Sequence, residues 1–263
     1  MGDPSERVLC VALGEYDIGW QDPAESMDRA AKVVAAGKRD GAALIVLPEM
    51  CTSGFTMDTT GFAEPLDGPS ARRLSRLARD HEVWITAGVP TRDSNSRARN
   101  SALVFDPSGA LIAHYDKQKL FGYASESDFY EPGDSAVIVE IEGVKVAPFI
   151  CYDLRFPEIF RSVAREVDMI VIIASWPAAR RAHWDTLLRA RAIENQCYVI
   201  GVNRTGNGGG LVYDGGSAAF DPWGGRVDSD RNGASSVRLA DVQAQEVKRV
   251  RAAYPFIQDL ARP

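Results

Sequence analysis

The chain alternates short apolar runs with stretches of helical periodicity, and this alternation constrains its fold more than any other feature. Strands that alternate with helices are typical of an α/β domain. Turn residues at Asp106-Pro107-Ser108-Gly109 and at Glu142-Gly143 each join two apolar runs into a predicted hairpin. Because hairpins add antiparallel pairs to an otherwise parallel arrangement, the sequence predicts an α/β fold with mixed sheets.

The pattern also predicts where the elements lie. Strands are expected at 8–13, 43–47, 83–88, 101–105, 111–115, 137–141, 145–150, 169–174, 198–203 and 217–220. Helices are expected at 22–38, at 69–80, from Pro157 onward, at 184–196 and at 241–251. The irregular stretch 118–134 predicts an active-site loop, since long unpatterned segments in compact domains often carry function. The glycine-rich segment 206–210 lacks the ending of a phosphate-binding loop and predicts a flexible surface turn.

The composition favours one large domain over residues 1–263, because 45% of the residues are hydrophobic and 25% are charged. A net charge of −6 argues against nucleic acid as a partner, since nucleic acid selects clustered cationic surface. No apolar run approaches membrane-spanning length, and the first residues do not resemble a secretory signal. We therefore expect a cytoplasmic protein with neither nucleic acid nor membrane as a partner.

The chain has few residues suited to a metal site or a disulfide framework. The four cysteines are Cys10, Cys51, Cys151 and Cys197, and the three histidines are His81, His114 and His183. The cysteines are widely separated without CxxC spacing, so they are expected to be reduced. So few histidines argue against a metal cage or a Cys-His dyad, and no metal or organic cofactor is expected. Cys10 and Cys197 are interpreted as packing residues, and Cys51 as packing or pocket lining.

Three reactive side chains stand within two residues of the end of a predicted strand: Glu49, Lys117 and Cys151. Taken singly, a cysteine usually packs, and a lysine or glutamate usually lies on the surface. Strand ends on one sheet edge, however, are where α/β proteins gather catalytic groups. The chemistry is coherent, because a thiol nucleophile needs a base such as Glu49, and a developing oxyanion needs donors such as Lys117 and the N–H of Tyr152.

Motifs around these residues resemble those of a known family. Leu47-Pro48-Glu49, Lys117-x-x-Leu120-Phe121 and the segment 151–158 are similar in order and spacing to the Glu-Lys-Cys motifs of the nitrilase-like carbon–nitrogen hydrolase superfamily. Further landmarks at 174–177, 191–196, 216–217 and 222–224 extend the resemblance over nearly the whole chain. The resemblance implies a four-layer α-β-β-α sandwich with two mixed sheets, assembled as a homodimer or a larger homo-oligomer.

The resemblance also implies roles beyond the three strand-end residues. Glu126 matches a second glutamate that orients the lysine in the family. The family usually has histidine two residues after the lysine, where this chain has Lys119, which is expected to be exposed. His183 and Trp184 are expected to pack and to cap the helix that they open, with a place lining the mouth of the site as the alternative.

The segments 152–157 and 176–184 resemble the omega-amidase branch, which hydrolyses amides of 2-oxo acids such as 2-oxoglutaramate. The implied reaction converts a small linear amide to an acid and ammonia through a cysteinyl thioester. Arg155 is a candidate ligand for a substrate carboxylate, with a structural ion pair as its alternative, and Arg180 or Arg181 could take its place. Trp176 and Phe55 are candidate apolar walls.

Other readings keep the same triad and change the substrate. They are a deaminated-glutathione amidase, an N-carbamoyl amino acid hydrolase, a short-acyl esterase and a nitrilase. A non-catalytic binding protein is the alternative from another class.

Overall fold

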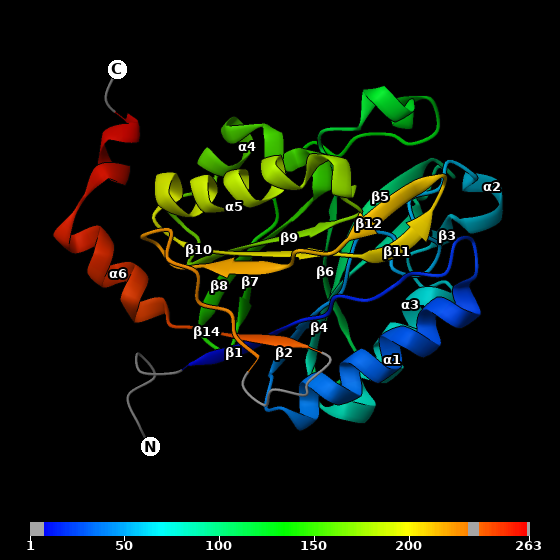
Figure 1. Cartoon of the computed structure of the whole chain (residues 1–263), viewed down its shortest axis with the longest axis horizontal. Helices are drawn as coiled ribbons and strands as arrows, with labels where there is room; N and C mark the ends of the chain where they lie inside the picture. Colours follow the sequence, from blue (N-terminus) through cyan, green and yellow to red (C-terminus); the bar gives the residue numbers. More distant parts are fainter. Residues whose placement is uncertain (1–7, 231–236, 262–263) are drawn as a thin grey trace.

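Figure 1 shows the protein as a computed structural model, which describes residues 8–230 and 237–261. One sheet contains β1 (Leu9–Leu13), β2 (Leu44–Val46), β3 (Glu64–Pro65), β4 (Trp84–Arg92), β5 (Ala98–Phe105), β6 (Leu111–Asp116) and β14 (Arg238–Val242). Its strand order is β14-β1-β2-β4-β5-β6, with β3 beside β4. A second sheet contains β7 (Val139–Ile141), β8 (Val144–Ile150), β9 (Met169–Ala174), β10 (Tyr198–Asn203) and β13 (Ala218–Phe220), in the order β13-β10-β9-β8-β7.

Both sheets are mixed, as the sequence predicts. β2 runs parallel to β1 and β4, whereas β5 runs antiparallel to β4 and β6. In the second sheet β9 is parallel to β8 and β10, whereas β7 and β13 are antiparallel to their neighbours. The predicted hairpins are β5-β6 and β7-β8.

Six α-helices lie around the two sheets in the part of the chain that the structure describes. They are α1 (Pro23–Arg39), α2 (Thr59–Phe62), α3 (Pro69–His81), α4 (Pro157–Arg161), α5 (Arg181–Asn195) and α6 (Ala244–Ala253). In Figure 1, α1 and α3 lie on one side of the sheets, and α4 and α5 lie on the other. The predicted four-layer α-β-β-α arrangement is therefore confirmed.

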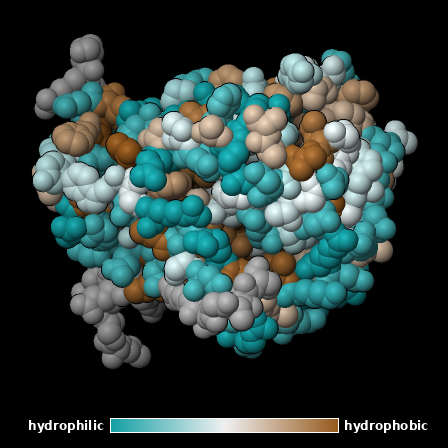
Figure 2. Space-filling model, in the orientation of Figure 1, coloured by the Kyte–Doolittle hydropathy of each residue, from teal (hydrophilic) through white to brown (hydrophobic). Residues whose placement is uncertain are grey.

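The alternation of apolar side chains explains the layers. Leu44 and Val104 of the first sheet share one buried cluster with Phe149 and Ile172 of the second, so this cluster fills the space between the sheets. The intervening positions in the first sheet, such as Ile45, pack in a second cluster with side chains of α1 and α3. The outer face seen in Figure 2 is mainly hydrophilic, and its hydrophobic residues form small separate groups.

Two element boundaries differ from the prediction for identifiable reasons. The helix expected from residue 184 begins at Arg181, directly after the 3₁₀ turn Ala178–Arg180. The helix expected from residue 241 begins at Ala244, because Asp241 and Val242 pair with β1.

The glycine-rich segment 206–210 is the clearest correction. The structure contains paired strands here, β11 (Thr205–Gly208) and β12 (Leu211–Asp214), where the sequence predicted only a surface turn. Gly209 and Gly210 form the turn with positive φ of 56° and 78°, a conformation that glycine adopts without strain.

The described part of the chain, 8–230 and 237–261, contains no helix both long and apolar enough to cross a membrane. That residues 1–263 form a single domain stays a prediction.

Candidate active site

Three buried charged side chains meet where the two sheets face each other. Glu49 follows β2, Lys117 follows β6, and Glu126 opens the 3₁₀ turn Glu126–Asp128. Lys117 Nζ lies 3.0 Å from Glu49 Oε1 and 2.8 Å from Glu126 Oε2. The side chains of both ion pairs have no solvent exposure. The structure therefore brings together the predicted Glu49, Lys117 and Glu126.

The two carboxylates keep Lys117 charged in spite of its burial. Burial alone lowers the pKa of a lysine, because the low-dielectric interior disfavours the ammonium. The nearby carboxylates of Glu126 and Glu49 outweigh this effect and raise the pKa of Lys117 above its ordinary value. These two contacts therefore favour the ammonium form of the side chain. Its Nζ also lies 5.2 Å from the centre of the Phe55 ring.

Glu49 is held by hydrogen bonds to both of its carboxylate oxygens. Asn100 Nδ2 donates to Oε1 at 2.8 Å, and the Ser175 N–H donates to Oε2 at 2.8 Å. Asn100 Nδ2 also donates to Glu126 Oε1 at 2.9 Å. Sequence reasoning missed Asn100, because one polar residue inside a strand carries no signal of its role.

Cys151 follows β8 in a strained backbone conformation. Its φ of 47° lies in the left-handed region, which costs energy for a residue with a side chain and is found mainly at functional sites. Burial and the neighbouring Glu49 carboxylate raise the pKa of the Cys151 thiol, while Lys117 and a hydrogen bond from the Ser175 N–H oppose them. The resting side chain is therefore a neutral thiol.

Asp153 connects the cysteine turn to the strand that carries Lys117. Its Oδ2 accepts hydrogen bonds from the Ile150 N–H at 2.9 Å and from the Tyr115 hydroxyl at 2.7 Å, and its Oδ1 accepts one from the Lys119 N–H at 2.9 Å. These three contacts fix Cys151 relative to the end of β6. Sequence reasoning assigned no role to Asp153.

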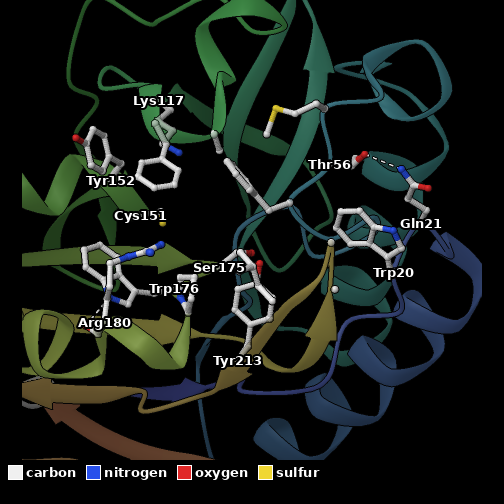
Figure 3. A pocket seen from close by; sticks show the side chains of 18 of the residues that line it. Trp20, Gln21, Thr56, Lys117, Cys151, Tyr152, Ser175, Trp176, Arg180 and Tyr213 are labelled. Carbon is white, nitrogen blue, oxygen red and sulfur yellow. Dashed lines mark hydrogen bonds between the residues drawn. The ribbon is translucent and has the colours of Figure 1, made fainter.

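A pocket of about 420 Å³ opens above these groups (Figure 3). Cys151 and Lys117 contribute to its lining, together with the predicted Phe55, Tyr152, Arg155, Trp176 and Arg180. Trp20, Gly208, Gly209, Leu211 and Tyr213 line it as well, so the β11-β12 hairpin that the sequence analysis left out of the site is part of the pocket wall. In Figure 3, Trp20 lies on the side of Cys151 opposite to Tyr152 and Arg180.

Two arginines face this pocket without a carboxylate partner among residues 8–230 and 237–261. Arg155 stacks over the Trp176 ring at 4.7 Å, and its Nη2 lies 3.2 Å from His183 Nδ1. Arg180 stacks over the Phe121 ring at 5.4 Å. The structural ion pair considered for Arg155 is therefore wrong within the part of the chain that the structure describes. Arg181 pairs with Asp214 at 2.7 Å and does not line the pocket.

Three further residues that the sequence predicted to lie near the site differ in how far they are buried. Lys119 is half-buried, contrary to the expected exposure, with its Nζ 5.0 Å from the Phe156 ring centre and 3.5 Å from Glu158. Trp184 packs in the core as expected, whereas His183 is exposed and contacts Arg155.

The other three cysteines lie away from the pocket lining. Cys51 and Cys197 are buried in apolar clusters, and the half-buried Cys10 packs against one of these clusters. Among the described residues, no group of three or more His, Cys, Asp or Glu side chains is arranged to hold a metal ion.

The site contains the groups that acyl transfer by a thiol requires. A neutral thiol needs a base, and the Ser175 N–H that donates to Glu49 Oε2 also contacts Cys151, so carboxylate and thiol are neighbours. The Lys117 ammonium is available to a developing oxyanion. With the α-β-β-α layers, this set is that of a thiol-dependent acyl-transfer enzyme.

The family model described as carbon–nitrogen hydrolase matches residues 10–252. A 2-oxoglutaramate amidase of Bacillus subtilis (strain 168) is 34% identical over 94% of this chain and 96% of its own length. The omega-amidase YafV of Escherichia coli (strain K12) is 37% identical over 95% of this chain and 96% of its own length. A crystal structure of a CN-hydrolase superfamily protein from Xanthomonas campestris, with an arsenic adduct in its active site, matches with a TM-score of 0.88 at 35% identity, covering 96% of this chain and 97% of that chain.

The chain belongs to the carbon–nitrogen hydrolase family. The predicted superfamily is therefore confirmed, as is the predicted enzyme class, a hydrolase that acts on amides.

Proposed function

We propose that the protein hydrolyses a small linear amide that carries a remote carboxylate, a 2-oxo dicarboxylic acid monoamide such as 2-oxoglutaramate. The observation that carries this proposal is the pocket itself, where a half-buried thiol beside a carboxylate and an ammonium shares its lining with two arginines that lack acidic partners in the described chain. The names of the relatives in Bacillus subtilis and Escherichia coli support the same substrate class.

In the acylation step Glu49 takes the proton of the Cys151 thiol, and the sulfur attacks the amide carbonyl carbon. The carbonyl π electrons move to oxygen, where the Lys117 ammonium and the Tyr152 N–H stabilise the negative charge. Glu49 then gives its proton to the amide nitrogen. The carbon–nitrogen bond breaks, ammonia leaves, and a thioester on Cys151 remains.

In the deacylation step Glu49 takes a proton from a water molecule, and the water oxygen attacks the thioester carbonyl. The carbon–sulfur bond breaks as the tetrahedral species collapses, and the proton on Glu49 returns to the sulfur. Glu126 orients Lys117, to which it lies within 2.8 Å. These residues move every proton of the scheme, so no metal or organic cofactor is required.

The arginines give the proposal its substrate class. A guanidinium fork matches a carboxylate bidentately. Among the described residues, Arg155 contacts Trp176 and His183, Arg180 contacts Phe121, and neither forms an ion pair with an acidic side chain. The neighbouring Trp176 and Phe55 supply apolar contact for the carbon chain between the carboxylate and the amide.

Ammonia release tests the substrate directly. We expect 2-oxoglutaramate and 2-oxosuccinamate to be hydrolysed much faster than glutamine or butyramide. Preferred turnover of deaminated glutathione, an N-carbamoyl amino acid, a short-acyl ester or a nitrile would assign the site to one of those reactions instead. If no member of the panel were turned over and a thiol-alkylating reagent left Cys151 of the folded protein unmodified, the chain would be a binding protein.

We also propose a homodimer or a larger homo-oligomer, and we keep the expectation of a cytoplasmic location. An exposed aromatic group supports self-association: Trp223, Tyr254 and Phe256 are 49%, 46% and 62% exposed, and Tyr254 contacts both other rings. Sedimentation analysis of the wild type and of Phe256→Glu tests this, since a monomeric wild type contradicts the proposal.

A further inference from the structure

Asn100 occupies a position between the two buried glutamates. It lies in β5 with no solvent exposure, and its Nδ2 is 2.8 Å from Glu49 Oε1 and 2.9 Å from Glu126 Oε1. The orientation of the amide follows from chemistry, because the opposite orientation would place Oδ1 against two carboxylate oxygens. Each hydrogen of one NH₂ group therefore serves a different carboxylate.

Lys117 alone does not neutralise the charge of the two carboxylates. Two buried carboxylates face one ammonium, so the ionised set carries an excess negative charge. Two carboxylates that share one buried site favour protonation of one member of the pair. The remaining donors to the pair are the Ser175 N–H on Glu49 and the Phe121 N–H on Glu126, each of which serves a single carboxylate.

We propose that Asn100 is a positioning residue that keeps the Glu49–Glu126 pair ionised and orients Glu49 as the base. Its NH₂ group and Lys117 both donate to Glu49 Oε1. In the described part of the chain, the other oxygen, Oε2, receives a hydrogen bond only from the Ser175 N–H, which leaves it able to take the Cys151 proton. This inference rests on the proposed function, in which Glu49 accepts that proton.

A second observation points the same way. Asn100 Oδ1 is buried and has no hydrogen-bond partner among the described residues. The hydrogen bonds of this side chain are therefore those of its NH₂ group, which donates to both carboxylates.

The pH dependence of the pair involves every ionisable group that faces it. Lys117 and Cys151 are the nearest, and Tyr130 and Tyr213 also interact with the pair electrostatically. Burial raises the pKa of Tyr213 to about 12, and the pKa of Tyr130 also lies above its ordinary value. Both tyrosines therefore stay neutral below pH 9.

The variant Asn100→Leu has a similar shape and removes both donated hydrogen bonds. Loss of a hydrogen bond to the charged form raises the pKa of a carboxylate. We expect the acidic limb of kcat/KM to move up by about one to two pH units, the shift that corresponds to one charged hydrogen bond. The acidic limb of Cys151 alkylation by iodoacetamide should shift in the same direction, because Glu49 must be ionised to take the thiol proton as the sulfur attacks the reagent.

Ser101→Ala is the matched control. Ser101 is the next residue of β5 and equally buried, but it hydrogen-bonds to Thr91 and Asp116 instead of the glutamates. The acidic limb of kcat/KM for Ser101→Ala should stay at its wild-type pH. If Asn100→Leu fails to fold, Asn100→Ser serves in its place, because one hydroxyl cannot donate to two carboxylates.

An unshifted acidic limb in a folded Asn100 variant overturns the proposal, even if kcat falls, and so does an equal shift in Ser101→Ala. The alkylation profile separates this test from the proposed function. A wild-type chain that hydrolyses none of the amides would refute the function, while the alkylation limb would still decide the role of Asn100.

Discussion

The variant Lys117→Met tests whether the buried cluster is charged as the geometry indicates. Wild-type Nζ lies within 3.1 Å of three carboxylate oxygens, two on Glu126 and one on Glu49. Methionine fills nearly the same volume but removes the one ammonium that contacts the pair within residues 8–230 and 237–261. Breaking a buried ion pair from one side costs about 3–5 kcal/mol, because it leaves charge uncompensated in the interior. A domain of this size has enough stability to remain folded at that cost.

The loss should depend on pH in a defined direction. Without the ammonium, the folded-state pKa of the glutamate pair rises above that of the unfolded chain. Such a carboxyl group has a higher pKa in the folded state than in the unfolded state, and it stabilises the fold at pH values below its unfolded-state pKa. This contribution is lost as the pH rises through its folded-state pKa. The deficit of Lys117→Met relative to the wild type should therefore be larger at pH 8 than at pH 5.

Urea unfolding at these two pH values measures the effect, with Lys119→Met as the control. The Lys119 side chain is partly exposed and lies 3.5 Å from Glu158, so its ion pair is worth at most about 1 kcal/mol. A deficit below about 1 kcal/mol in Lys117→Met, or an equal deficit at both pH values, would show that the cluster is not an ionised buried network. Turnover should fall by at least about a hundredfold, the usual effect of removing one oxyanion donor.

Three further predictions follow from the same geometry. Cys151→Ala should abolish ammonia release and leave the urea unfolding midpoint unchanged, whereas Cys197→Ala should change only the midpoint. Detectable turnover by Cys151→Ala would contradict a thioester intermediate. Arg155→Ala, or failing that Arg180→Ala, should lower kcat/KM for 2-oxoglutaramate about 10- to 150-fold while sparing butyramide, and equal losses on both amides would make the arginines structural. Burial raises the pKa of Asp153 from 3.8 to about 6, so this group makes the free energy of unfolding fall as the pH rises through that interval. Asp153→Asn should therefore flatten the dependence of the free energy of unfolding on pH, measured by urea titrations at several pH values.

The strand-end residues could be predicted from the sequence because their signal is local. Glu49, Lys117 and Cys151 each stand within two residues of the end of an apolar run, and the sheet edge then brings them together. The structure places Lys117 against Glu49 and in the same pocket as Cys151. Their catalytic roles remain predictions that the variants above test.

The supporting residues could not be predicted, because their partners are distant in sequence. Asn100 lies inside a strand and meets Glu49 from 51 residues away, a contact that exists only after β4 and β5 have paired. Asp153 accepts from the Tyr115 hydroxyl, 38 residues earlier in the chain. The β11-β12 hairpin is hidden for a different reason. Four of the five residues in 206–210 are glycine, and these glycines mask the strand periodicity on either side of the Gly209-Gly210 turn.

The resting charges of the site predict the shape of its pH profile. The pKa of the Cys151 thiol lies above its ordinary value of 9.0, and that of Lys117 is also raised, so neither group loses its proton between pH 7 and 9. The nucleophile therefore forms by proton transfer to Glu49 within the complex, and free thiolate is not required. We expect kcat/KM to rise once through the acidic limb of the glutamate pair and then to stay constant to at least pH 9. A Cys-His enzyme, by contrast, gains activity as a thiolate–imidazolium pair forms and loses it when the imidazolium deprotonates. A decline of kcat/KM between pH 7 and 9, measured with the protein still folded, would require another titrating group in the mechanism and would refute this assignment of charges.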